Sequence, residues 1–328
     1  MKSLIKRVLL VFVIVVIIIC VVLYFSPKPL IYLIKSQISE ANITAPSNFE
    51  TLNESITCYY DIEYEKDNKN SVLDICFPSN TTDSIPVIFF VHGGGFITGD
   101  KAMTKYFGPT IASHGYAFIS INYDLVPDVT VFEQYNQVVA AFNYFTTLSS
   151  SYPIDTEKVF LSGSSAGGFL TLQLLTSYFN DEYHLRNETI INKEIVIVGG
   201  LFYSAVYNIR EFQNEDDHVL RSFVVYQLGW AITGDRDWKT NINTTSLLNL
   251  KDFINPNFPP LFITDGNIMT FTNQAQEYVM LATGKGVSVE SLFFDDNIEV
   301  KHGYQLNMQT AQAILALQET LLFLEKYK

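Results

Sequence analysis

The sequence predicts an α/β fold, with a mostly parallel eight-stranded sheet that carries helices on both faces. Short apolar runs such as Pro86–Val91 are continuously hydrophobic, as strands buried on both faces are. Segments with apolar residues at helical spacing, such as Val131–Leu148, alternate with these runs. This alternation is typical of a parallel sheet with crossover helices, and the 328 residues are enough for one large core.

The strands can be assigned in chain order from the apolar runs and the turns between them. The first two, 56–64 and 71–77, flank the polar stretch 65–70 and therefore form a hairpin. Residues 204–258 are too long for a simple crossover, so they form either a helical lid insertion or a crossover with surface loops. Six further strands are expected at 86–91, 116–122, 159–162, 195–202, 260–264 and 289–294, and helices at 103–113, 131–148, from 169, at 274–283 and at 306–327.

The N-terminus predicts a membrane anchor. Val8–Phe25 is an uncharged run of 18 residues, long enough to span a bilayer as a helix, and too long for the core of a cleaved signal peptide. Lys2, Lys6 and Arg7 precede it, which favours a cytoplasmic N-terminus and a single-pass type II topology. The expected organisation is a cytoplasmic segment 1–7, a transmembrane signal anchor 8–25, a stalk or N-terminal cap 26–54 and a folded domain 55–328.

Glycosylation sequons and cysteines agree with a lumenal or extracellular domain, in the endoplasmic reticulum or at the cell surface. Only Cys58 and Cys76 lie outside the apolar run, and both fall in the predicted hairpin. Their midpoint is residue 67, inside the turn, so the hairpin places them opposite each other and predicts a cross-strand disulfide; two unpaired thiols are the alternative. Five Asn-x-Ser/Thr sequons occur, at Asn42, Asn53, Asn80, Asn187 and Asn243.

Charge and composition exclude some classes of function. The formal net charge is −13, with 34 acidic and 21 basic residues and no basic patch, which argues against a nucleic-acid partner. No cluster of His and Cys has zinc-ligand spacing, so no metal and no organic cofactor is implied.

Two glycine-rich motifs indicate the chemistry of the site. Gly163-Ser164-Ser165-Ala166-Gly167 lies between a predicted strand and a predicted helix, where Gly-x-Ser-x-Gly forms a nucleophile elbow; a plain tight turn is the alternative. The strand 86–91 ends in His92 followed by three glycines, 93–95, whose backbone N–H groups are unobstructed, as an oxyanion hole requires. A flexible loop would explain the glycines but not the preceding strand.

Together the motifs resemble the α/β-hydrolase superfamily, in its hormone-sensitive-lipase-like and carboxylesterase branch. Supporting similarity lies in Leu73–Pro78, Asn122–Pro127 and Lys301–Tyr304, and the resemblance extends from about Ser55 to the C-terminus. It implies the α/β-hydrolase fold, with Ser165 as nucleophile and His302 as base. The oxyanion donors are then the N–H groups of Gly94, Gly95 and Ala166, with His92 shaping the glycine loop.

The triad acid departs from the family pattern. The expected position after the strand 260–264 falls on Met269, and Asp265 is the only carboxylate in that loop. Asp265 can serve if it comes within reach of the histidine ring. Asp295 and Asp296 remain alternatives, and Asn267 is an uncharged one.

Two functions of different classes follow. The first is a membrane-anchored serine hydrolase that cleaves lipid-like or aryl carboxylic esters through an acyl-enzyme, with the membrane contacted through the N-terminal helix. The second is a catalytically weak or inactive hydrolase-fold ectodomain used for binding. Met269 at the acid position favours the second, and intact Ser165, His302 and glycine motifs favour the first.

Overall fold

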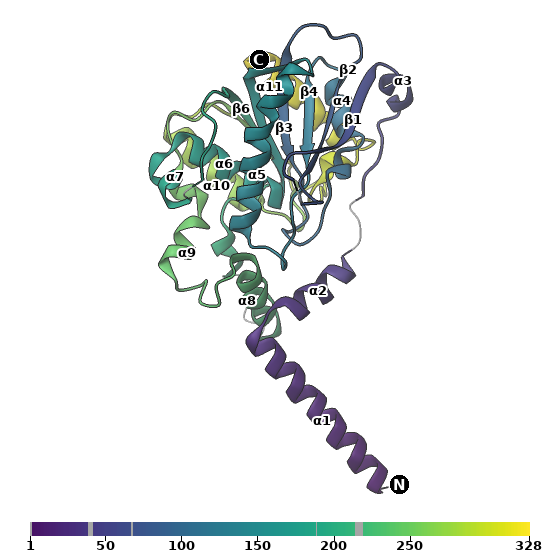
Figure 1. The fold of residues 1–328 in the computed structure, drawn as a ribbon, viewed down its shortest axis with the longest axis vertical. Coiled ribbons are helices and arrows are strands. Elements are labelled where there is room, and N and C mark those ends of the chain that lie inside the picture. Colours follow the sequence, from purple (N-terminus) through teal and green to yellow (C-terminus); the bar gives the residue numbers. More distant parts are fainter. Residues whose placement is uncertain (1, 39–41, 67, 188, 214–218) are drawn as a thin grey trace.

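One twisted sheet organises the molecule. The computed structural model describes residues 2–38, 42–66, 68–187, 189–213 and 219–328, and in these ranges eight strands form one sheet in the order β1-β2-β4-β3-β5-β6-β7-β8 (Figure 1). β2 is antiparallel to both β1 and β4, and the remaining pairs are parallel, which confirms the predicted fold class. The strands are β1 Ile56–Glu63, β2 Val72–Pro78, β3 Ile85–Val91, β4 Ala117–Ile121, β5 Ile154–Ser164, β6 Ile197–Tyr203, β7 Leu261–Thr264 and β8 Val289–Leu292.

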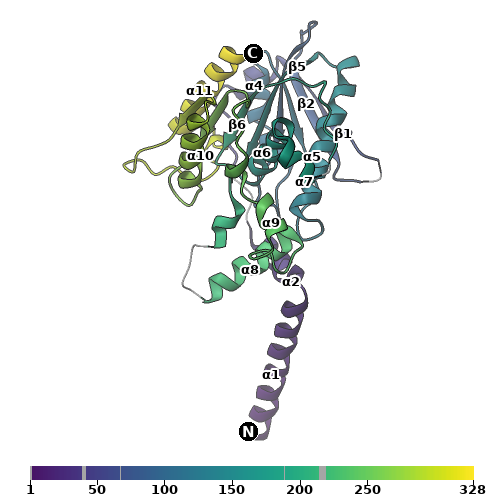
Figure 2. The same ribbon diagram turned by 90° about the vertical axis from the view of Figure 1, so that its left-hand side faces the viewer.

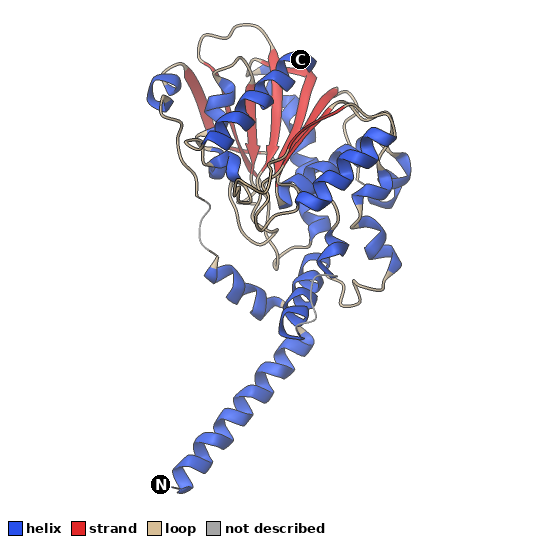
Figure 3. Ribbon diagram, turned by 180° about the vertical axis from the view of Figure 1, so that it is seen from behind, coloured by secondary structure: helices blue, strands red, loops and turns tan. Residues whose placement is uncertain are grey.

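Helices cover both faces of this sheet (Figure 3). Successive strand residues point to opposite faces. Phe89 of β3 accordingly packs against Phe142 of α5, whereas its neighbour Phe90 packs against Phe107 of α4. The helices of the sheet domain are α3 Phe49–Asn53, α4 Phe107–Ala112, α5 Val131–Phe145, α6 Ala166–Phe179, α7 Asp181–Asn187, α10 Thr272–Gly284 and α11 Ala311–Tyr327.

Two predicted helices differ from the expectation in their extent. The helix expected at 306–327 begins at Ala311, because the Thr310 side chain caps it by accepting a hydrogen bond from the N–H of Ala313. The helix expected at 103–113 is divided into the 3₁₀ turn η1, Lys101–Thr104, and α4. Pro109 fits only the first turn of a helix, which is consistent with the start of α4 at Phe107.

The hairpin at the sheet edge is closed by a disulfide. Cys58 in β1 lies opposite Cys76 in β2, their Cα atoms are 4.1 Å apart, and their sulfur atoms are bonded. Asp67, the midpoint of the expected turn, lies outside the described residues. The bond ties the outermost strand to its neighbour.

We expect the Cys58→Ser/Cys76→Ser variant to lose about 3 kcal/mol of unfolding free energy, because the bridge restricts the unfolded chain over a short loop. Urea unfolding of the two proteins measures this loss. Non-reducing peptide mapping of the wild type is the control, and thiols that alkylate there would contradict the bridge.

The N-terminal helices contact the segment 204–258. α1, Lys2–Phe25, contains one stretch, Ser3–Phe25, that is long and apolar enough to cross a membrane; it is unburied and projects from the sheet domain (Figure 1). α2, Lys28–Gln37, turns back and packs against α8, Val219–Thr233 (Figure 2). Segment 204–258 is helical over much of its described length, with 3₁₀ turns η3 Ile209–Gln213 and η4 Leu250–Phe253 and helices α8 and α9 Ile242–Leu247, whereas residues 214–218 lie outside the described ranges.

Candidate active site

Ser165 sits at a sharp turn between β5 and α6. Its backbone adopts φ 52° and ψ −122°, a conformation that side-chain-bearing residues rarely take. The start of α6 packs closely against the loop after β3: a Cβ on Gly167 would lie 2.2 Å from the His92 carbonyl oxygen. A Cβ on Gly163 would lie 2.6 Å from Thr171 Oγ1. The glycines of the motif are therefore steric requirements of this turn.

His302 lies on the loop after β8 and reaches Ser165. Its Nε2 is 2.9 Å from Ser165 Oγ. The Gly303 N–H donates a hydrogen bond of 3.1 Å to Ser204 Oγ, and Ile268 and Lys301 form an isolated backbone β-bridge. Both contacts hold the loop in place. Burial lowers the pKa of His302 to about 4, so the ring is neutral at pH 7 and can accept the serine proton.

A threonine hydroxyl stands between His302 and the buried carboxylate. His302 Nδ1 is 2.9 Å from Thr270 Oγ1, and the same hydroxyl donates to Asp265 Oδ1. Asp265 follows β7, is fully buried, and accepts further hydrogen bonds from the N–H groups of Gly266 at 2.8 Å and Phe271 at 3.1 Å. Burial raises the pKa of Asp265, although these hydrogen bonds oppose that shift.

The hydrogen bonds that link Asp265, Thr270, His302 and Ser165 fit one arrangement of protons. Thr270 gives its own proton to Asp265, so its oxygen is available to accept the N–H at Nδ1 of His302. A proton on Nδ1 leaves Nε2 as the acceptor for Ser165. Asp265 therefore reaches the histidine through Thr270.

The other candidates for the acid lie elsewhere. Met269 is 85 % exposed, and Asp295 and Asp296 are exposed in the loop before His302. The Asn267 side chain donates to the backbone oxygens of Asp295 and Ile298 and so fixes that loop. Sequence reasoning missed Thr270, because no motif marks it and only the folded loop brings it to the imidazole.

The glycine loop presents N–H groups beside Ser165. Gly94 and Gly95 have φ values of 126° and 61°, and a Cβ on Gly94 would lie 2.0 Å from the carbonyl oxygen of Thr98. Ala166 opens α6, so its N–H has no intrahelical acceptor. These three residues are thus available as oxyanion donors, and Gly94, Gly95 and Ser165 line one cavity.

His92 supports this loop from behind. It is buried, its Nδ1 lies 2.7 Å from the Gly93 carbonyl oxygen, and its ring stacks on Tyr123 at 4.4 Å. The Tyr123 hydroxyl donates to the His92 carbonyl oxygen at 2.8 Å. His92 thus shapes the loop, and the segment 122–127 holds it in place.

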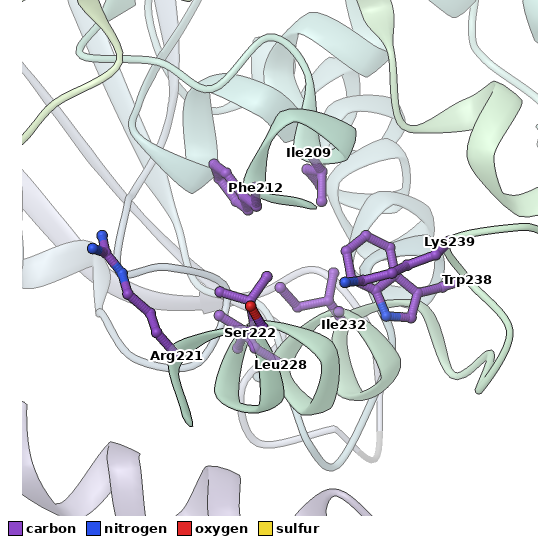
Figure 4. A pocket seen from close by; sticks show the side chains of 10 residues that line it. Ile209, Phe212, Arg221, Ser222, Leu228, Ile232, Trp238 and Lys239 are labelled. Carbon is purple, nitrogen blue, oxygen red and sulfur yellow. The ribbon is translucent and has the colours of Figure 1, made fainter. Parts of the chain in front are cut away.

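Ser165 opens into a cavity of about 1260 Å³. Part of its wall comes from outside the sheet domain: Ile34 from α2, Ile38 just after it, and Leu228 from α8. A smaller cavity of about 120 Å³ lies between η3 and α8, with Ile209 and Phe212 on one side and α8 on the other (Figure 4). Leu228 borders both cavities. Among the described residues, no group of three or more His, Cys, Asp or Glu side chains is placed to hold a metal ion.

A protein-family model matches much of the chain. The BD-FAE model matches residues 73–281, which is more than half of the chain. The matched range contains the glycine loop, Ser165 and Asp265, and it ends before His302.

Curated relatives match shorter segments. Tuliposide A-converting enzyme 2 of Tulipa gesneriana is 33% identical over 98 residues, and these are 26% of this chain and 26% of that protein. Acetyl esterase of Salmonella schwarzengrund (strain CVM19633) is 30% identical over 103 residues, 29% of each chain. The chain therefore spans less than a third of the length of these two relatives.

A solved structure resembles nearly the whole fold. Esterase B from Lactobacillus rhamnosis (HN001) superposes with a TM-score of 0.75 at 17% sequence identity and covers 87% of this chain and 88% of its own. At this identity the likeness shows the fold, which is that of the α/β-hydrolases.

Proposed function

The chain belongs to the BD-FAE family, and from this premise we propose that it is a membrane-anchored serine hydrolase of carboxylic esters. The observation that carries the proposal is the 2.9 Å contact between Ser165 Oγ and His302 Nε2, at a strained turn beside open glycine N–H groups. Burial keeps His302 neutral at pH 7, and a neutral imidazole is the form that can take the serine proton.

The first half-reaction forms an acyl-enzyme. Ser165 Oγ attacks the ester carbonyl carbon, and its proton passes to His302 Nε2. The N–H groups of Gly94, Gly95 and Ala166 hold the negative oxygen, and each such donor typically lowers the barrier by about 3 kcal/mol. His302 then gives the proton to the alcohol oxygen as the bond between that oxygen and the carbonyl carbon breaks.

Water completes the cycle by the same route. It gives a proton to His302 and attacks the acyl carbon, and the carboxylic acid leaves as Ser165 regains its proton. Thr270 orients the imidazole throughout by accepting its Nδ1 proton. Asp265 polarises Thr270, so the carboxylate stabilises the imidazolium across one hydroxyl group.

The apolar part of the cavity wall supports the proposed substrate class. Apolar side chains from several elements line it, and its volume of about 1260 Å³ exceeds the usual range for small-molecule sites. Lipid-like or aryl esters match this apolar part of the wall, while Asp100, Lys105, Glu299 and Lys301 also line the cavity. The aliphatic lining residues are Ile34, Ile38, Ile43, Ile97, Ala102, Met103, Leu228, Val300 and Leu306.

A catalytically silent binding domain is the second candidate, and the indirect contact between Asp265 and His302 favours it. A fluorophosphonate probe separates the two, because it bonds only to an activated serine. We expect labelling that peptide mapping places on Ser165. Failure to label the folded, detergent-solubilised protein would support the silent domain.

We expect Thr270→Val to lower kcat about 10- to 100-fold, because the Nδ1 proton of His302 loses its acceptor while the fold keeps an isosteric side chain. The pH dependence of kcat/KM supplies a readout that simple misfolding would not move. Wild-type activity should fall on the acid side near the His302 pKa of about 4. In Thr270→Val the acidic limb of the pH profile should shift to lower pH. The missing hydrogen-bond acceptor destabilises the protonated ring of His302 more than the neutral ring, and this lowers the pKa of His302 further.

Thr270→Ser is the matched control, since it keeps the hydroxyl and removes a methyl group. It should restore both turnover and the acid limb. Equal turnover in wild type and Thr270→Val would show that Thr270 plays no part in orienting His302.

The membrane part of the proposal rests on α1 and on the sequons. Treatment with peptide N-glycosidase should lower the apparent mass of cell-expressed protein, because a lumenal domain exposes its sequons to glycosylation. Asn42, Asn53, Asn80 and Asn243 are exposed, whereas the side chain of Asn187 lies outside the described part. An unchanged mass, together with digestion by protease added from the cytosolic side, would reverse the topology.

A further inference from the structure

Helix α8 separates the active-site cavity from the end of the anchor. Leu228 on one side lines the cavity with Ser165, and Gly229 and Ile232 line the smaller cavity behind it. On the other side, Gln227 donates a hydrogen bond of 3.0 Å to the carbonyl oxygen of Leu23, in the last turn of α1. Figure 2 shows α8 lying crosswise at the level where α1 ends.

The side of α8 that contacts α1 also carries exposed apolar residues. Val219, Leu220 and Phe223 are 87 %, 76 % and 39 % exposed. Spacings of one, three and four residues place them within an arc of about 100° on one face of the helix, which Gln227 and Trp230 extend. We call Val219, Leu220 and Phe223 the α8 patch.

An aromatic and basic cluster marks the boundary between α1 and α8. The Arg236 guanidinium lies 4.1 Å from the centre of the Tyr24 ring and 5.5 Å from that of Trp230. Trp, Tyr and Arg are the side chains that collect where a membrane-spanning helix meets the headgroups. The cluster therefore sets the headgroup level at α8, beside the α8 patch.

We propose that the α8 patch rests in the lumenal leaflet, so that esters dissolved in the bilayer enter the cavity between α2 and α8. The inference rests on the anchoring and hydrolase activity proposed above. A bilayer is the occupant that these observations favour, because the patch continues the surface of α1 at its exit from the membrane. Entry along α2 and α8 spares an apolar ester the cost of crossing water.

The first test locates the patch and needs no activity. Full-length Leu220→Cys protein, in a Cys20→Ser background, is labelled with an environment-sensitive fluorophore and placed in phosphatidylcholine vesicles. We expect brominated lipids to quench this label strongly. Met280→Cys, which labels an exposed residue on α10, is the matched control and should stay bright.

Equal quenching at both positions would overturn the proposal. Energy transfer between labels on two protein copies, without lipid quenching, would assign the patch to a dimer and overturn it as well.

The second test measures access of substrate. Val219→Ser/Leu220→Ser should raise KM for a long-chain fluorogenic ester in vesicles about tenfold or more, because two aliphatic side chains no longer favour the docked position. Hydrolysis of water-soluble p-nitrophenyl acetate should not change, since neither residue lines the active-site cavity or the smaller cavity beside it. Met280→Ser should leave both rates unchanged.

The outcomes separate the two proposals. If the wild type hydrolyses neither ester, the proposed function fails, and the quenching result still decides where the patch lies. If both esters are hydrolysed and the double variant has the wild-type KM for the long-chain ester in vesicles, the proposed entry of substrate from the leaflet is wrong. The proposed hydrolase activity is then unaffected.

Discussion

Replacing Ser165 by alanine should reduce hydrolysis of short p-nitrophenyl esters about 10⁴-fold or more, to a level set by binding and the oxyanion hole alone. The variant loses the atom that bonds to the carbonyl carbon. It keeps the Cβ atom, and therefore also the strain of the backbone at φ 52°. The lost hydrogen bond to His302 is worth about 1 kcal/mol, so the melting temperature should hardly change.

Fluorophosphonate labelling is the parallel measurement for this variant, because it should disappear together with turnover. Ser150→Ala, on an exposed turn after α5, is the matched control and should retain both. Full turnover in Ser165→Ala would reject the elbow assignment and with it the proposed mechanism.

Replacing His302 by alanine should lower kcat by about four orders of magnitude, because the serine then has no base and the leaving alcohol no acid. Burial and packing change little, since the ring lies at the cavity wall, where Phe271 meets it edge-on at 5.4 Å. Steady-state kinetics at pH 7, with the fold verified by circular dichroism, measures the effect.

His114→Ala is the control for this change, since His114 is exposed and follows α4. It should leave turnover unaltered. Unaltered turnover in His302→Ala would instead mean that another histidine serves Ser165. His92 is poorly placed for that role, because it is buried behind the glycine loop and stacked on Tyr123.

Features that depend on neighbours in the chain could be predicted from the amino-acid sequence. Gly163 can be recognised from the motif because the steric demand on it comes from nearby residues, Gly167 and Thr171, whereas Gly167 faces the distant carbonyl oxygens of Val91 and His92. The opposition of Cys58 and Cys76 follows from counting along one hairpin. The strand ends were predicted to within two residues except for the start of β5, which lies at Ile154 and not at 159. The buried strands could be recognised because they are continuously apolar.

The path from His302 to its carboxylate depends on how distant parts of the chain pack together. Asp265, Thr270 and His302 come from two loops, and the path of each loop depends on the packing of β7 and β8. Position counting after β7 indicated Met269, which the folded loop turns to solvent. A one-residue difference in such a loop redirects a side chain, so spacing alone could not reveal the intervening hydroxyl group.

Tertiary structure also decided what surrounds the cavity. Ile34 and Leu228 are almost two hundred residues apart in the chain, and they share the cavity because α2 packs against α8. Contact between two helices is set by the shapes of their surfaces, which the spacing of apolar residues along each helix does not specify. The long apolar N-terminal helix was evident from the uncharged run, whereas its contact with α8, which borders the active-site cavity, required the fold.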